Sequence, residues 1–189
     1  MLGLPYSCIP AMIDETPQPG LAPRQAAEDI ALRKVAEVVS RDCHSPPWIF
    51  GADTIVVLEG RIFGKPKDRG DAQSMLEQLA GRQHEVITAM ALYNGRQKTT
   101  DCRSTATRVT FARLTGEEIE WYLDTGEWEG VAGSYRLQEA GGCLIESING
   151  SPSGVAGLPL HDFFVMLKDN GYPLYFPSSA LMMRLREGG

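Results

Sequence analysis

The sequence predicts an α/β protein with a mixed sheet, and three observations carry that prediction. Apolar residues recur at helical spacing in several segments, the longest of which covers residues 24–40. Residues 48–58 (WIFGADTIVVL) are rich in aromatic and β-branched side chains, which is typical of a largely buried strand. The dipeptides Glu59-Gly60 and Asn94-Gly95 are turn signals that predict hairpins. Because helices and hairpins alternate irregularly, a mixed sheet fits best.

The composition is that of an ordinary globular protein with one domain, or one domain of two lobes. Of the 189 residues, 43 % are hydrophobic and 22 % are charged. The net charge of −6 argues against non-specific nucleic-acid binding, although a few lysines could still hold a small anion.

No segment approaches the ~20 apolar residues of a membrane span, and we expect neither a signal peptide nor a membrane partner. The four cysteines form no Cys-x-x-Cys pair, so we expect reduced thiols in a cytoplasmic protein.

The helices have recognisable ends in the sequence. Pro23 can occupy the first turn of the helix at 24–40. Asp68 is suited to cap a helix over residues 69–80, and Gly81 is suited to end it. Further expected elements are strands at 61–63, 84–93 and 97–112, a helix opened by a capping box at Thr115–Glu118 and running to Asp124, strands within 133–149 broken by Gly141-Gly142, and a last helix at 160–169.

Asp53 and Lys34 stand out because each is a charged residue in an apolar setting. Asp53 lies inside the buried strand, where an unpaired carboxylate is costly, so it must meet a cation, a metal or several donors, or lie at a strand end that faces a cleft. Lys34 is four residues after Ile30 and four before Val38, so it projects from the apolar face of its helix. Taken alone, Lys34 is most simply interpreted as a lysine whose stem packs while its ammonium reaches water.

Glu15 and Lys65 complete the set of charged candidates. Glu15 follows Asp14 before a Pro-rich loop, where a solvated turn is the simplest interpretation of the two acids alone. Lys65 lies between Gly64 and Pro66, an arrangement that suits phosphate binding, although the spacing is not that of a P-loop. Together the acids could hold a divalent metal and activate water, while the lysines neutralise phosphate oxygens. Hydrolysis between phosphates needs both.

At these residues the chain resembles the Maf family of nucleoside triphosphate pyrophosphatases, over roughly residues 2–172. The segments that carry the resemblance occur in family order: Asp14-Glu15-Thr16, Lys34 in its helix, Gly51-Ala52-Asp53-Thr54, Gly64-Lys65-Pro66-Lys67-Asp68, residues 81–88 (GRQHEVIT), residues 107–111 (TRVTF), Ala132-Gly133-Ser134-Tyr135 through Gln138, and Gly157-Leu158-Pro159-Leu160.

The resemblance implies an elongated two-lobed fold like that of inosine triphosphate pyrophosphatases, with a cleft between the lobes. It implies hydrolysis of a nucleoside triphosphate to the monophosphate and pyrophosphate, with a divalent metal such as magnesium or manganese. It also implies roles for single residues. Asp53 would be the general base, Glu15 a metal-binding or catalytic acid, and both would hold the metal. Lys34 and Lys65 would bind phosphate.

Two further positions separate the branches of the family, and they match Thr54 and Gln138 here. Glutamine at the second position is the pattern of the branch that cleaves dTTP and UTP, including modified pyrimidine analogues. A glutamine amide can donate and accept toward a pyrimidine edge, whereas an ionised glutamate only accepts. By the same resemblance, a homodimer is expected.

The ends of the chain differ from the family pattern. Family members begin with a strand and a Ser-x-Ser-Pro-Arg-Arg phosphate loop, whereas Met1 matches a position late in the following helix. We therefore expect that Met1 is not the natural start. The domain is expected over residues 1–172, with a weakly patterned tail at 173–189. An inactive truncated remnant and a non-enzymatic nucleotide-binding regulator of cell division stay open as alternative functions.

Overall fold

A computed structural model of the chain describes residues 4–41 and 47–174. The helices are α1 (Pro23–Arg41), α2 (Arg69–Leu79), α3 (Gly116–Asp124), α4 (Pro152–Val155) and α5 (Leu160–Asp169), with two 3-10 turns, η1 (Ala132–Ser134) and η2 (Ala140–Leu144). The strands are β1 (Trp48–Leu58), β2 (Arg61–Phe63), β3 (Gln83–Asn94), β4 (Thr99–Phe111) and β5 (Ile145–Asn149). The α/β class predicted from the sequence is confirmed.

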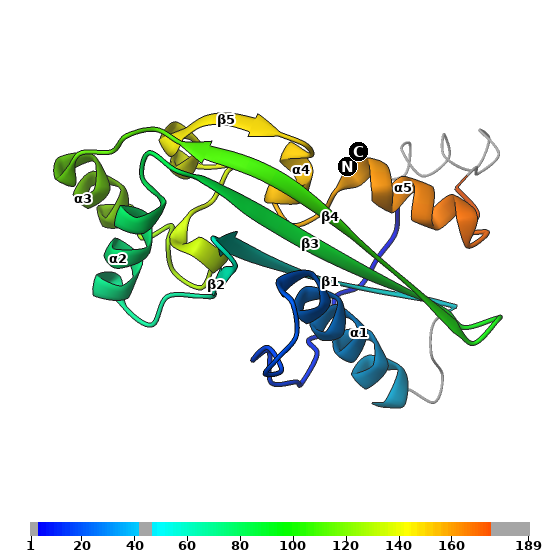
Figure 1. Cartoon of the computed structure of the whole chain (residues 1–189). Coiled ribbons are helices and arrows are strands. Elements are labelled where there is room, and N and C mark those ends of the chain that lie inside the picture. Colours follow the sequence, from blue (N-terminus) through cyan, green and yellow to red (C-terminus); the bar gives the residue numbers. More distant parts are fainter. Residues whose placement is uncertain (1–3, 42–46, 175–189) are drawn as a thin grey trace, which may run out of the picture.

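The five strands form one sheet in the order β2-β1-β3-β4-β5. All four pairings between these described strands are antiparallel, so the mixed sheet expected from the sequence is here an antiparallel one. For the β1–β2 and β3–β4 pairings the reason is local, because a short loop joins the two strands of each pair and returns the chain in the opposite direction. The long strands β3 and β4 run diagonally through the whole molecule and give it an elongated shape (Figure 1).

The two hairpin turns have different structures. Glu59 and Gly60 form the expected two-residue turn with φ values of 50° and 80°, and Leu58 pairs with Arg61 across it. The second loop is longer than the Asn94-Gly95 signal indicates. Asn94 is the last paired residue of β3, its side chain accepts from two backbone N–H groups of the loop, and the residue with positive φ is Lys98.

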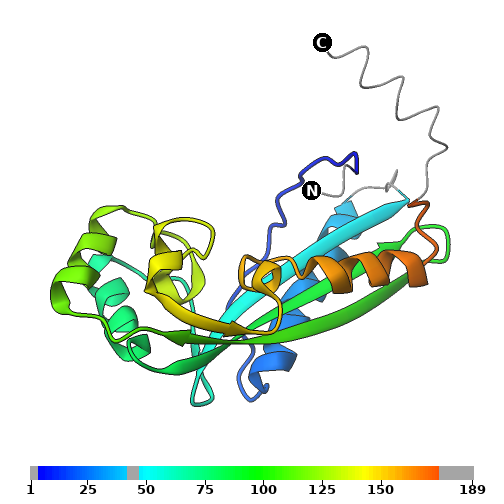
Figure 2. The same ribbon diagram turned by 90° about the horizontal axis from the view of Figure 1, so that it is seen from above.

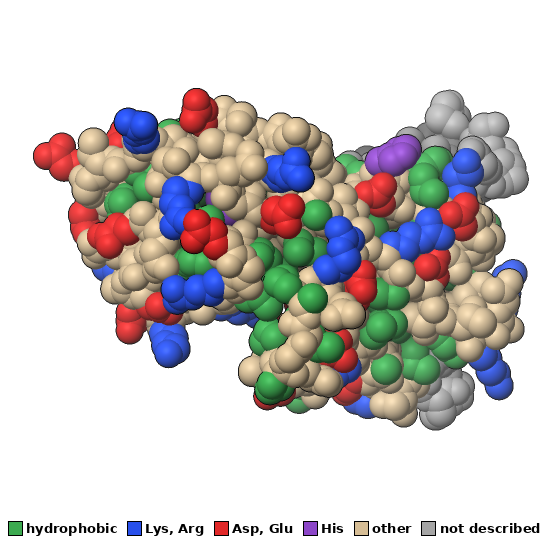
Figure 3. Space-filling model, viewed as in Figure 1, with side chains coloured by type: hydrophobic (Ala, Val, Ile, Leu, Met, Phe, Trp, Pro, Cys, Tyr) green, Lys and Arg blue, Asp and Glu red, His purple; other side chains and the backbone are tan. Residues whose placement is uncertain are grey.

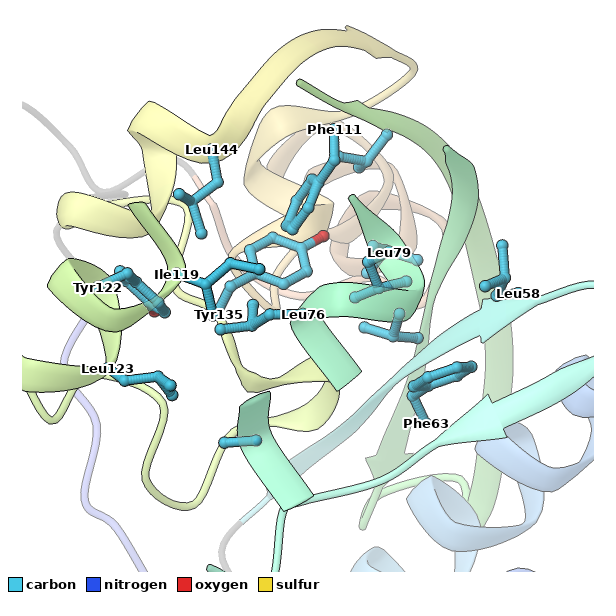
Figure 4. Packing of buried hydrophobic residues seen from close by; sticks show 14 residues of the cluster. Leu58, Phe63, Leu76, Leu79, Phe111, Ile119, Tyr122, Leu123, Tyr135 and Leu144 are labelled. Atoms are coloured by element: carbon cyan, nitrogen blue, oxygen red, sulfur yellow. The ribbon is translucent and has the colours of Figure 1, made fainter. Parts of the chain in front are cut away.

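The two halves of the sheet carry different layers (Figures 1 and 2). In one half, α1 packs on one face against β1, β3 and β4, and α5 lies over the other face. In the other half, α2, α3 and η1 enclose a second core. Figure 4 shows that core, with Phe111, Tyr135 and Leu76 packed between strands and helices. The expected two-lobed arrangement therefore corresponds to one continuous sheet with one hydrophobic cluster in the half that carries α2 and α3 and two, under α1 and under α5, in the other half.

Most helix ends follow the sequence signals. Asp68 caps α2 by accepting from the N–H of Asp71 at 2.8 Å. Thr115 and Glu118 form the expected capping box of α3. The expectation for residues 133–149 is wrong in its first part, because two 3-10 turns precede the single strand β5. Glycines in tight backbone contact explain this, since a Cβ at Gly141 would lie 2.6 Å from the carbonyl oxygen of Arg136.

The remaining segments differ little from expectation. The short helix α4 was not expected from the sequence, and it is capped by the side chain of Ser151. Within the described residues no helix is long and apolar enough to cross a membrane. The domain boundary at residue 172 stays a prediction, because the tail from residue 175 onward lies outside the described part of the chain.

Candidate active site

One cleft of about 540 Å³ is lined by all six residues that the sequence singles out, namely Glu15, Lys34, Asp53, Thr54, Lys65 and Gln138. They come from the loop before α1, from α1, from β1, from the loop after β2 and from the loop after η1. The space-filling view shows the surface notched where the half that carries α2 and α3 meets the half that carries α1 (Figure 3). The cleft therefore joins segments that are far apart in the chain.

The cleft extends around the edge of β1. Consecutive residues of a strand point to opposite faces, so Asp53 faces α1 while Thr54 faces the other side of the sheet. Strand β2 pairs only with Val56–Leu58, and among the described strands none lies along the preceding part of this edge. Side chains from both faces of β1 therefore reach the same cleft.

Lys34 reaches Asp53 because α1 lies close to β1. Small residues of α1, such as Ala27 and Ala31, are fully buried against the sheet. Gly51 leaves room for the helix, since a Cβ there would lie 2.9 Å from a methyl group of Val35. The Lys34 side chain, 19 % exposed, thus projects from the packed face of α1 toward the strand, as its position in the sequence predicts.

Two lysines and two carboxylates form a connected charge cluster, which we call the cleft cluster. The Nζ atom of Lys34 lies 2.8 Å from Oδ1 of Asp53 and 3.0 Å from Oε1 of Glu15. It also donates to the carbonyl oxygen of Ala52 at 3.3 Å. The Nζ atom of Lys65 lies 2.7 Å from Oε2 of Glu15. The cluster is neutral in total, so no buried charge lacks an opposite partner.

The cluster changes the proton affinities of its members. Burial raises the pKa of Asp53 above its ordinary value, and the ammonium of Lys34 only partly offsets this. Burial alone would lower the pKa of Lys34, but hydrogen bonds and charge interactions with Asp53 and Glu15 outweigh it and raise the pKa. The hydrogen bond from Lys65 is the main reason that the pKa of Glu15 lies below its ordinary value. The cleft cluster therefore shifts the pKa values of its two acids in opposite directions.

The opposite wall of the cleft has no acidic side chain, and Arg136 is its one charged group among the described lining residues. Thr54 lies there, with its Oγ1 atom 2.9 Å from Oγ1 of Thr88. Gln138 is exposed on the loop after η1. Gly133 packs this loop against β1, because a Cβ there would lie 2.7 Å from Val56, and its N–H donates to the carbonyl oxygen of Gly64.

Sequence reasoning missed three side chains that shape this wall. Arg136 lines the cleft, and its guanidinium donates to the carbonyl oxygens of Glu127 and Glu129, which fixes the loop. Tyr135 also lines the cleft and is buried. Thr88 lies beneath Thr54 and is fully buried. A hydroxyl within an otherwise apolar strand, as in Val86–Met90, is the signal that could have pointed to Thr88.

The oxygen-rich character of the cluster bears on metal binding. Lys34 touches one oxygen of Glu15 and one of Asp53, which brings the two carboxylates together. Magnesium and manganese prefer oxygen ligands, and one or two carboxylates with water and phosphate oxygens form a common ligand set for magnesium. Within residues 4–41 and 47–174 there is no group of three or more histidine, cysteine, aspartate or glutamate side chains that could hold a metal ion. The carboxylates of Glu15 and Asp53 therefore fit a metal ion whose remaining ligands include oxygens of a bound phosphate.

The sequence profile described as Maf-like protein matches residues 1–170 of this chain. Among curated relatives, a protein named dTTP/UTP pyrophosphatase from Symbiobacterium thermophilum is 40 % identical over 174 residues, which cover 92 % of this chain and 88 % of the relative. A protein of the same name from Syntrophomonas wolfei is 42 % identical over 90 % of this chain and 89 % of its own length. Another from Myxococcus xanthus is 39 % identical over 94 % of this chain and 88 % of its own length. The chain belongs to the Maf family.

Proposed function

We propose that this protein hydrolyses dTTP and UTP to the nucleoside monophosphate and pyrophosphate. The observation that carries the proposal is the cleft, which brings the two lysines and two carboxylates of the cleft cluster together with the polar side chains of Thr54 and Gln138. The relatives that bear the name dTTP/UTP pyrophosphatase support the same reaction and favour it over an inactive remnant or a non-enzymatic regulator.

In the proposed reaction, water attacks the α-phosphorus and the bond from that phosphorus to the bridging oxygen breaks. Asp53 takes the proton from the attacking water, a role that suits a carboxylate whose pKa is raised by burial. Lys34 and Lys65 bind phosphate oxygens and stabilise the charge that develops on them. Both ammonium groups already contact acidic oxygens in the cleft, so they are placed to bind anionic oxygens there.

Glu15 and Asp53 would hold the magnesium or manganese ion. When bound, this ion would neutralise phosphate charge and so favour attack at phosphorus. The carboxylates are close enough to share one ammonium group, which supports their joint use as ligands.

Thr54 and Gln138 would contact the pyrimidine base. Both residues line the same cleft as the cleft cluster, and Thr54 lies on the opposite face of β1 from Asp53. The amide of Gln138 can donate to a carbonyl oxygen of the base, and such polar matching discriminates strongly between ligands. Action on modified pyrimidine triphosphates, homodimerisation and a cytoplasmic location stay predictions.

The test is an assay of pyrophosphate release from dTTP, UTP, CTP, GTP and ATP, with magnesium and with manganese. We expect release from dTTP and UTP to exceed release from the other three. Addition of a chelator should abolish it. Failure to release pyrophosphate from any nucleotide, with a protein that is folded by circular dichroism, would contradict the proposal, and so would a preference for purines.

A further inference from the structure

Two threonine hydroxyls lie in a row that leads from the cleft into the protein. Thr54 of β1 and Thr88 of β3 are directly opposite each other in the sheet. Thr54 lines the cleft, whereas Thr88 is fully buried. Their Oγ1 atoms are 2.9 Å apart, and Oγ1 of Thr88 lies 2.7 Å from the carbonyl oxygen of Gly154 in α4.

The row has only one possible direction of donation. A carbonyl oxygen accepts hydrogen bonds and cannot donate, so the single hydroxyl proton of Thr88 goes to Gly154. Thr88 therefore has only lone pairs left for Thr54, and the hydroxyl proton of Thr54 must point to Thr88. It follows that Thr54 presents to the cleft an oxygen that accepts and does not donate.

The acceptor at the end of the row is held in place. The side chain of Ser151 caps α4 by accepting from the N–H of Gly154 at 3.0 Å. Thr107, which is also buried, accepts from the N–H of Ser151 at 3.0 Å. Space around Gly154 is limited, since a Cβ there would lie 3.2 Å from the Cβ of Ser151. The carbonyl of Gly154 therefore cannot easily turn away from Thr88.

We infer that Thr88 is a positioning residue that makes the cleft select uracil and thymine over cytosine. The inference rests on the proposed function, in which Thr54 contacts the base. Along the base-pairing edge of uracil or thymine, the only donor is N3–H, so an oxygen that only accepts can pair only with that atom. In cytosine the N3 atom is itself an acceptor and the donor is the neighbouring N4 amino group, so a base held with N3 toward Thr54 would place two acceptors against each other. The hydroxyl of Thr54 could by itself donate or accept a hydrogen bond. The contact with Thr88 leaves it only able to accept, so it pairs with N3–H.

The test is binding of the non-hydrolysable α,β-imido analogues of UTP and CTP, measured by calorimetry. The wild type should bind the UTP analogue more tightly. Thr88→Val keeps the shape of the side chain but frees the proton of Thr54, so the ratio of the two dissociation constants should fall about tenfold. Thr88→Ser keeps the hydroxyl and should restore the ratio to within about twofold of the wild type.

Ser134→Ala is the matched control, because it removes another buried hydroxyl, one that bonds to the sulfur of Met75 and contacts neither Thr54 nor α4. It should leave the ratio unchanged even if it lowers the melting temperature as much as Thr88→Val does. Three results would overturn the inference: a wild type without preference for the UTP analogue, a ratio unaffected by Thr88→Val, or an equal fall with Ser134→Ala. Turnover of UTP, measured separately, decides the proposed function, so either idea can fail without the other.

Discussion

Ionisable side chains are charged and paired in the cleft cluster, whereas the buried histidine of the core behind it is neutral. In the cleft, Lys34 and Asp53 are partly buried, and each has an opposite charge within 3.0 Å. In the core, His84 is 2 % exposed and has only the hydroxyl of Tyr135 as a partner, at 2.9 Å from Nε2. Its Nδ1 atom is buried and has no hydrogen-bond partner within the described residues. Burial therefore lowers the pKa of His84 to about 4.

This difference distinguishes side chains suited to act on a ligand from side chains that contribute to packing. The cleft cluster keeps its charges at some cost in desolvation, which makes sense if those charges act on a ligand. We call His84, Phe111 and Tyr135 the aromatic cluster, because their rings pack edge to face with centroids 4.8–5.6 Å apart. There the ionisable ring stays neutral and contributes packing. Tyr135 also lines the cleft, so the aromatic cluster supports the cleft wall without sharing its charges.

The largest effect is expected for Asp53→Asn. The change removes the proposed base and a metal ligand but keeps the volume, so kcat should fall about 10²–10⁴-fold for dTTP and UTP alike. The melting temperature should change little, since Lys34 keeps its contact with Glu15. Steady-state kinetics and thermal unfolding check both parts. Retention of more than about a tenth of the wild-type turnover would show that Asp53 is not the base.

His84 should make folding sensitive to acid. Between pH 6.5 and about 4 the unfolded chain binds a proton at His84 that the folded chain does not bind, so acidification favours unfolding. The change in pKa from 6.5 to about 4 corresponds to a loss of about 3 kcal/mol in unfolding free energy as the pH falls through that range. Above pH 6.5 the effect is absent.

The measurement is urea unfolding of the wild type and of His84→Gln at several pH values. The variant cannot titrate at this position, so the difference in unfolding free energy between the two proteins should shift by about 3 kcal/mol across the range. Turnover of the folded variant at neutral pH should stay near that of the wild type. A pH-independent difference would mean that His84 is not held neutral in the core.

Gln138→Glu tests whether the base and the phosphates are bound by different parts of the cleft. A carboxylate can no longer donate to a carbonyl oxygen of the base, so kcat/KM for dTTP and UTP should fall about 10- to 100-fold. Inhibition by pyrophosphate should change much less, because the phosphates are expected on the other face of β1. Glu139→Gln changes the charge of the adjacent residue, which does not line the cleft, and serves as the control. Equal losses for every nucleotide would assign Gln138 a structural role.

The smallest effect is expected for Lys65→Ala. Its side chain is 59 % exposed, so solvent and salt screen its charge. We expect KM for UTP to rise about fivefold at low salt and the difference from the wild type to shrink as salt is added. Lys67→Ala is the matched control, since Lys67 is in the same loop but does not line the cleft. Equal effects of the two changes would show that only the general charge of the loop matters.

Much of the fold could be predicted because its signals are local. The capping box of α3, the cap of α2 by Asp68 and the turn at Glu59-Gly60 each depend on residues within four positions of one another. The loop after β3 could not be predicted in detail. There the strand pairing continues through Asn94, and this longer pairing overrides the preference of the Asn-Gly dipeptide.

By itself, the sequence determined which residues were candidates for chemistry, because a charge in an apolar strand or on an apolar helix face is visible without coordinates. Asp53 and Lys34 were found in this way. Only the tertiary structure decided which groups meet. The register of β1 on β3 places Thr54 against Thr88, and the packing of two aromatic rings keeps His84 neutral. Each of these two contacts joins residues more than 25 positions apart in the chain. The pKa of His84 also depends on its burial away from water, which no local sequence pattern shows.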